Sequence, residues 1–242
     1  MRIAVLSDVH ANLAALEAVL ADAGSVDAVW HLGDVVGYGP EPDGVVDRLR
    51  AAGAIGVRGN HDAAACGGPE IEWFNPDARR AMEWTRRAIG GEALEWLRAQ
   101  PERRTEGASE LVHGSHREPL WEYVTSAPIA NANLGVLASQ IGLHGHTHVP
   151  LAFVVAEDGS GIKEVPGRPG TILELAGRRA LVNPGSVGQP RDGNRDSSYL
   201  LWEPDADRVT WRRVAYDVPA VQRQMRERGL PASLTTRLAV GL

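Results

Sequence analysis

The sequence has a single cysteine, Cys66, among its 242 residues. An intramolecular disulfide and a zinc site built from cysteines are therefore excluded. A long apolar run is also missing, since the apolar residues 3–6 directly behind the first methionine and arginine are too few for a secretory signal or a membrane span. We therefore expect a cytoplasmic protein without a membrane partner.

Positive charge is scarce as well. The formal net charge is -6 and the pI is about 5.8, so the chain carries no general electrostatic footprint for nucleic acid, and we do not expect nucleic acid as a partner. A hydrophobic fraction of 43% and a charged fraction of 23% are typical of a globular chain. The length suits one domain over residues 1–242, while the oligomeric state stays open.

The first quarter of the chain alternates strand and helix patterns. Strands are predicted at residues 2–7, 27–32 and 55–57, and helices at 12–23 and 43–52. Such alternation favours a parallel sheet, whose ligands bind beyond the carboxyl ends of the strands. The polar triplets that follow the three strands are Ser7-Asp8-Val9, Gly33-Asp34-Val35 and Gly59-Asn60-His61. We expect them at one edge of the sheet.

The remainder predicts a helical cap and further strands. Residues 76–100 have helical spacing, and residues 218–228 and 233–242 read as surface helices. We interpret the glycine- and proline-rich segment 157–170 as an exposed hairpin connection or loop. Short β-like runs follow residue 101, at 111–112, 141–143, 151–155, 172–175, 180–182, 199–202 and 209–214. They predict a second sheet that faces the first.

Histidines and carboxylates recur in short blocks. Asp8 and His10 are two positions apart, so in extended backbone their side chains would project to the same face, and His146 and His148 repeat this spacing. Either pair alone is weak, because polar residues at a strand edge are usually just solvated. The ordered set is stronger, and five of the eight histidines lie in it. Its blocks are Asp8-Val9-His10, Gly33-Asp34, Gly59-Asn60-His61, His113 and Gly145-His146-Thr147-His148.

With these blocks the sequence resembles the calcineurin-like metallophosphoesterase superfamily, whose ordered signature is DxH, GD, GNH, a single H and GHxH. All five blocks match, from Asp8 to His148, over about six tenths of the chain. Residues 7–12 and 183–188 resemble a small bacterial subgroup, often labelled as related to diadenosine tetraphosphatase or phosphodiesterase. The resemblance implies an α/β fold, a four-layer α-β-β-α sandwich of two facing mixed sheets flanked by helices, with a small helical cap at about 70–100 and C-terminal helices at about 218–242.

The resemblance also implies a centre of two divalent transition metal ions. One ion would be bound by Asp8, His10 and His148, the other by Asn60, His113 and His146, and Asp34 would bridge both. Mixed oxygen and nitrogen ligands suit manganese, which we favour, as well as iron, zinc or nickel, and are poorly matched to magnesium or calcium.

In this family a hydroxide held between the metals attacks phosphorus, and the resemblance makes His61 the catalytic proton donor to the leaving oxygen. Two structural alternatives stay open. His61 could instead orient Asn60, and His113 could be a core histidine at the end of a strand. His31 and His144 lie within strand patterns and are left out of the metal site.

Substrate contacts are predicted for Asn60 and for polar groups near the blocks, because guanidinium groups suit oxyanions. Each of these neighbours could equally be an ordinary surface or structural group, and residues 183–191 could be a tight connection between strands. The predicted substrate-binding residues are Asn12, Arg58, Asn60, Arg117 and Arg191, with His116 as a further candidate.

These features predict a hydrolase of phosphodiesters, or of phosphomonoesters, acting on a small molecule or nucleotide. Protein serine/threonine phosphatases of the superfamily carry an arginine shortly after GD, and residues 33–39 contain none. This disfavours the alternatives of a protein phosphatase and a dinucleotide polyphosphate hydrolase. A nuclease would need a basic groove. Outside the enzymes, a metal-binding regulatory module is the alternative, although every ligand position is retained.

Overall fold

The computed structural model describes residues 1–242, and its first three strands form the expected parallel unit. Strands β1 (Ile3–Leu6), β2 (Ala28–His31) and β3 (Ile55–Gly56) lie in the order β3-β2-β1. They are joined by α1 (Leu13–Ala23) and α2 (Pro42–Ala51). Their carboxyl ends therefore point to the same edge, as the alternating pattern predicts.

Three strands from the end of the chain complete this first sheet. β11 (Ser197–Glu203) pairs antiparallel with β1, β12 (Arg208–Val214) with β11, and β9 (Ile172–Glu174) with β12. The prediction that these segments belong to the second sheet is wrong. β1 is buried along its whole length, so the edge that β2 leaves free needs a backbone partner, and β11 supplies it.

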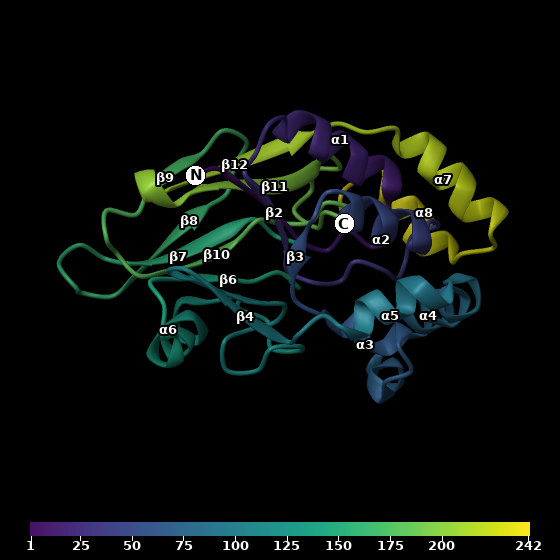
Figure 1. Ribbon diagram of the computed structural model, residues 1–242, viewed down its shortest axis with the longest axis horizontal. Helices are drawn as coiled ribbons and strands as arrows, with labels where there is room; N and C mark the ends of the chain where they lie inside the picture. The colour runs from purple at the N-terminus through teal and green to yellow at the C-terminus, as the bar shows by residue number, and fades with distance from the viewer.

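The second sheet has the order β4-β5-β6-β10-β7-β8 (Figure 1). The segment 157–170 is a hairpin connection that contains β8 as an edge strand. Strand β4 and helix α6 (Ala127–Val136) were not predicted from the sequence. The strands of this sheet are β4 (Arg103–Glu106), β5 (Ser109–Val112), β6 (Ile141–Leu143), β7 (Leu151–Val155), β8 (Ile162–Pro166) and β10 (Ala180–Asn183).

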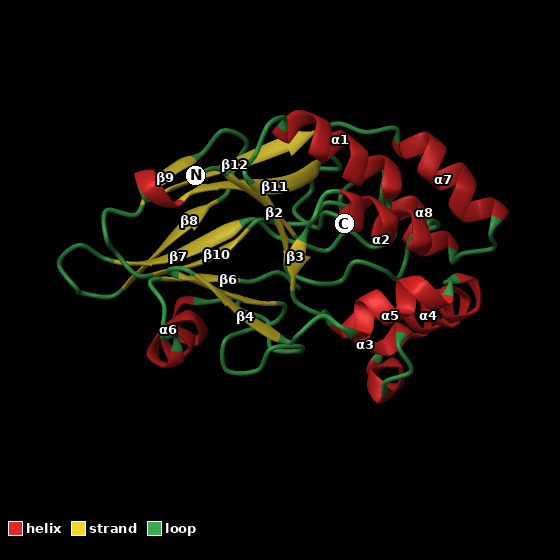
Figure 2. Cartoon of the chain, viewed as in Figure 1, coloured by secondary structure: helices red, strands yellow, loops and turns green.

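Three hydrophobic clusters lie between the layers. Ile3 and Val5 of β1 pack between the sheets, whereas Ala4 and Leu6, which alternate with them, pack against the helices on the outer face. Helix α6 covers the outer face of the second sheet, where Ala130 and Leu134 belong to one hydrophobic cluster with Phe153. Figures 1 and 2 show the resulting arrangement of helices outside two adjacent sheets. The four-layer α-β-β-α prediction is confirmed.

The segment after β3 consists of several short helices, and two of them fall within residues 76–100, where helices are predicted. Helix α3 (Asn60–Ala65) is followed by a 3-10 helix η1 (Pro69–Trp73), then by α4 (Pro76–Ala88) and α5 (Gly91–Arg98). We call residues 69–98 the cap segment. Asn75 begins α4, because its Oδ1 accepts a hydrogen bond from the Ala78 N–H at 3.0 Å.

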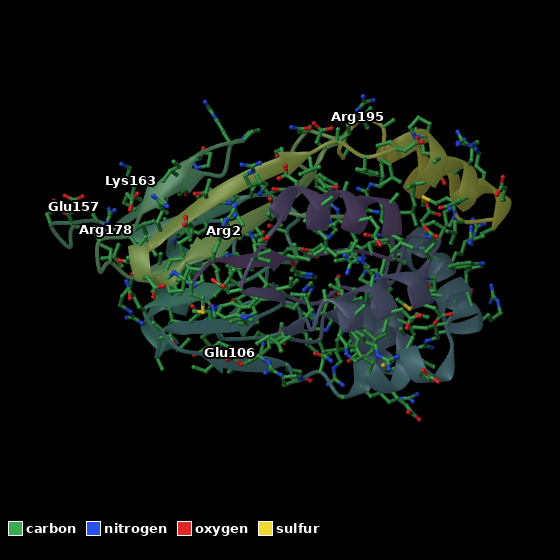
Figure 3. All side chains as sticks on the ribbon, turned by 45° about the horizontal axis from the view of Figure 1, so that its top comes forward. Arg2, Glu106, Glu157, Lys163, Arg178 and Arg195 are labelled. Carbon is green, nitrogen blue, oxygen red and sulfur yellow. The ribbon has the colours of Figure 1, made fainter.

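Two further helices end the chain, α7 (Val218–Glu227) and α8 (Ala232–Arg237), and the second is shorter than predicted. A short 3-10 helix, η2 (Pro204–Ala206), joins β11 to β12. At the end of the molecule opposite the cap segment, Arg178 Nη1 lies 3.7 Å from Glu157 Oε1, near Lys163 (Figure 3). None of the helices combines the length and the apolar character needed to cross a bilayer.

Candidate metal centre

The two sheets bring the polar blocks to one edge. Asp8 follows β1, Asp34 follows β2, Asn60 follows β3, His113 follows β5 and the remaining ligand candidates follow β6 or β1. Parallel strands in each sheet place these ends side by side, and the facing sheets bring both sets together. The seven predicted ligands are all at most 4% exposed: Asp8, His10, Asp34, Asn60, His113, His146 and His148.

Most of these ligands have left-handed backbone, which is uncommon for residues other than glycine. The φ angles are 53° at Asp8, 49° at His10, 52° at Asp34, 66° at His146 and 60° at His148. The prediction that each DxH or HxH pair meets through extended backbone is therefore wrong, because tight turns bring the side chains together. Such backbone costs on the order of 1 to 3 kcal/mol per residue and persists where the surrounding structure enforces it, often at functional sites.

Glycines allow the turns to approach one another. A Cβ on Gly59 would lie 2.1 Å from Asp34 Oδ1, and one on Gly145 would lie 1.9 Å from Ser7 Oγ. Neither position has room for a side chain. The glycines of the GN and GH blocks are thus required by close packing of one ligand turn on the next.

A first group of ligand atoms comes from three turns. His148 Nε2 lies 3.2 Å from Asp8 Oδ1, and His10 Nε2 lies 3.2 Å from His148 Nε2. Asp34 Oδ2 is 3.6 Å from His10 Nε2. These four side chains each offer one donor atom within 4.8 Å of the others, which is the spacing of ligands around one cation.

A second group shares Asp34. His113 Nε2 lies 3.0 Å from His146 Nδ1, 3.0 Å from Asn60 Oδ1 and 3.4 Å from Asp34 Oδ2. The other carboxylate oxygen, Oδ1, accepts a hydrogen bond from the backbone N–H of His61 at 2.9 Å. This bond orients Asp34 so that Oδ2 faces both groups.

The hydrogen bonds of the imidazole Nδ1 atoms show whether the Nε2 atoms are free to bind a cation. His10 Nδ1 lies 3.2 Å from the Val36 carbonyl oxygen and His148 Nδ1 lies 2.6 Å from that of Gln189. A carbonyl only accepts, so both Nδ1 atoms carry the proton and both Nε2 atoms present lone pairs. These lone pairs meet across 3.2 Å, beside an Asp8 Oδ1 that accepts no hydrogen bond. A cation satisfies this arrangement, and the side chains fit a divalent metal.

The electrostatics agree with that fit. Burial lowers the pKa of His10, His146 and His148, which keeps these rings neutral, as metal ligands must be. His113 differs: against the effect of burial, the carboxylate of Asp34 raises its pKa to about 9. The Asp34 carboxylate thus favours a positive charge beside the His113 ring. In the metal-free protein a proton on His113 supplies this charge, and a bound cation would supply it instead.

Residues behind the ligands hold the turns in place. Asp62 accepts hydrogen bonds from the Val36 N–H at 3.1 Å and the Gly59 N–H at 3.0 Å, and so joins the GD and GN turns. Ser186 Oγ donates to the backbone carbonyl of Asp8 at 2.8 Å. Asn183 Nδ2 donates to the Gly145 carbonyl at 2.7 Å. The segment 183–189 therefore braces the ligand turns, a role that its turn-forming sequence alone did not indicate.

A cavity of about 110 Å³ opens above the ligands. Its wall includes His61, Tyr38 and Arg191 beside the metal-binding side chains. Burial lowers the pKa of His61 to about 4, so its ring is neutral at pH 7. Tyr38 was missed by sequence reasoning, although the Gly37-Tyr38-Gly39 turn directly after the GD block was a signal for it.

Only some of the predicted substrate-binding residues lie at the cavity. Asn60 and Arg191 line the cavity. The lining does not include Asn12, Arg58 or Arg117. Asn12 instead begins α1 and donates to the Gly188 carbonyl at 3.0 Å, whereas the two arginines form ion pairs with Glu102 and Glu122, respectively.

Three histidines lie outside both the ligand set and the cavity lining. His116 Nδ1 lies 3.1 Å from Glu110 Oε1, and burial lowers the pKa of His116 to about 4. His31 and His144 are fully or almost fully buried, and burial lowers the pKa of each to about 3. None of the three belongs to a group of candidate metal ligands.

Several known proteins are similar to this chain in sequence or in fold. A metallophosphoesterase from Sphaerobacter thermophilus is 48% identical, with a TM-score of 0.92 over 100% of this chain and 99% of that one. An uncharacterized protein of Methanocaldococcus jannaschii is 34% identical over 99% of this chain and 98% of its own length. A hypothetical protein from Pyrococcus horikoshii shares the fold, with a TM-score of 0.81 and 20% identity over 100% of this chain and 98% of that one.

The calcineurin-like phosphoesterase superfamily domain matches residues 1–207, a range that contains every predicted ligand and the bracing segment. Buried aspartate and histidine side chains in that range form the two candidate metal groups. The chain belongs to the calcineurin-like phosphoesterase superfamily.

Proposed function

We propose that this chain is a dinuclear metal-dependent phosphoesterase that hydrolyses a small phosphodiester, or less readily a phosphomonoester. The observation that carries the proposal is the position of Asp34 Oδ2, which lies 3.6 Å from His10 Nε2 and 3.4 Å from His113 Nε2. One carboxylate oxygen thus faces two separate groups of ligand atoms. A shared carboxylate is typical of two-metal hydrolases.

The ligand atoms indicate which ions would bind. One site would consist of Asp8, His10, Asp34 and His148, and the other of Asp34, Asn60, His113 and His146. Imidazole nitrogens with carboxylate and amide oxygens suit manganese, iron, zinc or nickel, and we favour manganese. Two such ions, when bound, would make a water-derived nucleophile available near neutral pH and offset charge on the phosphate oxygens.

His61 is the proposed proton donor to the leaving oxygen. Its ring lies in the cavity wall, 4.3 Å from the Tyr38 ring and stacked at 4.4 Å on Phe74, so packing fixes its orientation. Its backbone N–H also anchors Asp34. In the free protein this ring is neutral at pH 7, so proton donation requires that the negative charge of a bound phosphate raise the pKa of His61. Packing then keeps the protonated ring in place beside the leaving oxygen.

Arg191 is the proposed phosphate-binding residue. Its Nη2 donates to Gln189 Oε1 at 2.8 Å, while its Nε is buried without a hydrogen-bond partner. The guanidinium lies 5.8 Å from the centre of the Tyr38 ring. The side chain lines the cavity, and a guanidinium group suits the binding of an oxyanion.

The cavity also limits the substrate. Its volume of about 110 Å³ suits one phosphate group, and Arg191 is the sole lysine or arginine in its lining. A polyphosphate chain or a nucleic acid would require more cations, and a phosphoprotein loop would require more room. Residues 33–39 supply Tyr38 to the wall where protein phosphatases carry their arginine.

The test is metal analysis coupled to hydrolysis. Purified protein would be stripped with a chelator, reloaded separately with manganese, iron, zinc, nickel or magnesium, and assayed with bis-p-nitrophenyl and p-nitrophenyl phosphate. We expect about two ions per chain and faster hydrolysis of the diester with manganese than with magnesium. Two bound ions without turnover of either ester or of any nucleotide would refute the enzyme and support a regulatory module.

A further inference from the structure

Aromatic side chains line the outer part of the cavity. Trp73 and Phe74 come from the cap segment, and Trp121 and Tyr123 from the connection between β5 and α6. Aromatic residues make up only 5% of this chain, yet one of its two phenylalanines and two of its seven tryptophans lie here. The aromatic groups are therefore concentrated beside the metal centre. We call Trp73, Trp121 and Tyr123 the aromatic rim.

The rings of the aromatic rim pack against residues of the candidate metal centre and against each other. Tyr123 stacks on the ligand His146, with ring centroids 4.0 Å apart and an interplanar angle of 17°. Trp73 meets Trp121 edge to face at 5.1 Å. Trp121 in turn lies 5.9 Å from Phe74, which stacks on His61. The rim thus contacts a metal ligand candidate directly, and Phe74 lies between the rim and the proposed proton donor His61.

Two members of the rim remain open to solvent. Trp73 is 66% exposed and Tyr123 is 44% exposed, although each has one neighbour among the rings. Packing does not account for a tryptophan that is two thirds exposed, because its burial contributes little. An exposed ring at the mouth of a charged cavity instead offers a flat apolar surface to whatever enters.

We propose that the aromatic rim binds a planar aromatic group of the substrate, the base of a nucleoside phosphate ester, while the phosphate occupies the metal centre. The inference rests on the proposed function, because it describes the substrate of that same site. Asn75 supports it: its Oδ1 caps α4, which leaves the amide Nδ2 as a hydrogen-bond donor at the edge of the cavity. Stacking recognises any base, so the rim selects nucleosides as a class.

The experiment compares the KM values of three methyl phosphodiesters, which carry a nucleoside, the same sugar without the base, and a phenyl group. Metal-loaded protein would be assayed by ³¹P NMR with the methyl ester of adenosine 5′-phosphate, the methyl ester of ribose 5-phosphate and methyl phenyl phosphate. We expect the KM of the adenosine ester to be about tenfold or more below that of the ribose ester. Preference for the phenyl ester over the adenosine ester would identify an aryl group, and not a base, as the planar group.

Variants separate stacking from general damage. Trp73→Leu keeps an apolar side chain but removes the ring, so we expect the KM of the adenosine ester to rise about tenfold and the KM of the ribose ester to change much less. Trp73→Phe should retain most of the affinity. Val136→Ala, at an exposed apolar residue outside the cavity lining, is the control. Equal KM values for the adenosine and ribose esters, or an equal effect of Trp73→Leu on both, would overturn the proposal.

A binding measurement distinguishes failure of the rim from failure of the chemistry. If no ester were hydrolysed, the proposed function would be refuted. Tryptophan fluorescence would still show whether the aromatic rim binds a base. Adenosine 5′-phosphate should quench the emission more strongly than ribose 5-phosphate, and Trp73→Leu should reduce that difference. Identical responses to the two phosphates would count against the rim.

Discussion

Asn183 makes a prediction about how the metal ligands are held. The residue is fully buried, and its Nδ2 donates to the Gly145 carbonyl at 2.7 Å and to Thr147 Oγ1 at 3.1 Å. Its Oδ1 accepts a hydrogen bond from the Gly185 N–H at 2.8 Å. Gly145 and Thr147 flank His146 in the GHxH turn, so Asn183→Ala should loosen this turn without removing any ligand.

The loss of stability expected for Asn183→Ala depends on which hydrogen bonds its former partners still make. The Gly145 carbonyl keeps a second donor, the Thr147 N–H at 2.8 Å, so the loss of that bond leaves no unpaired acceptor. The Gly185 N–H has no other partner and is orphaned in the interior. An orphaned buried donor costs about 1 to 3 kcal/mol, and each of the other two bonds about 0.5 to 1.5 kcal/mol. Together these terms lower the free energy of unfolding by roughly 2 to 6 kcal/mol.

Thermal unfolding followed by circular dichroism measures this loss in chelator-treated protein, where metal binding does not contribute. At roughly 2 to 4 °C per kcal/mol for a chain of this size, the midpoint should fall by at least about 4 °C. In metal-loaded protein, kcat/KM should also fall. The control is Asn131→Ala, at an exposed asparagine of α6, which should change stability by less than about 0.5 kcal/mol.

A thermal midpoint for Asn183→Ala within about 1 °C of the parent would refute the energies assigned to these hydrogen bonds. The unpaired Gly185 N–H alone is expected to lower the midpoint by more than this. A normal midpoint shift with unchanged kcat/KM would refute only the link to His146. The two readouts thus test the brace and its effect on the site separately.

Three further predictions concern the site and its surroundings. Asp34→Asn removes the one carboxylate that faces both ligand groups, so elemental analysis should find at most one ion per chain and hydrolysis should be lost; two retained ions would contradict the shared site. His61→Ala should retain both ions but lower kcat by roughly 10² to 10⁴, and an unchanged kcat would assign proton transfer to another group. A hydrogen bond from Arg117 lowers the pKa of Glu122 from 4.5 to about 2, so this carboxylate stabilises the fold above pH 4.5 and loses that effect as the pH falls toward 2. Glu122→Gln should therefore cost about 1 kcal/mol or less at pH 7, because the pair is partly exposed, and the difference in thermal midpoint should shrink between pH 4.5 and pH 3; a constant difference would exclude the ion pair as its cause.

The sequence patterns predicted which segments form strands better than they predicted how those strands pair into sheets. The parallel unit of β1, β2 and β3 was predictable because short connecting helices leave few other topologies. The pairing of β9, β11 and β12 with that sheet was not, because an apolar alternating run does not indicate which sheet edge is free to accept it. Helix α6 was also missed, since its sequence combines a proline, a glycine and two asparagines with few strongly apolar residues.

Backbone conformation at the ligands was equally beyond the sequence. Spacing of two residues predicted extended backbone at Asp8 and His10, whereas both have positive φ. The glycines next to the ligands indicated tight turns, but the left-handed conformation of the ligands themselves is enforced by contacts with other turns, such as the hydrogen bond from the Gly188 N–H to the Asp8 carbonyl. Those contacts join segments far apart in the chain.

The sequence by itself determined which donor atoms the candidate site offers, because ligand types can be read directly: Asp8, Asp34 and Asn60 offer oxygen, and histidines offer nitrogen. Tertiary structure alone decided what surrounds that site. Arg58 and Arg117 lie beside motif residues in sequence and yet pair with glutamates, whereas Trp73 and Tyr123 come from separate segments and meet at the cavity. The physical reason is that a ligand requires a particular donor atom, while a substrate-binding wall requires only the right surfaces to converge, and convergence depends on packing across the whole chain.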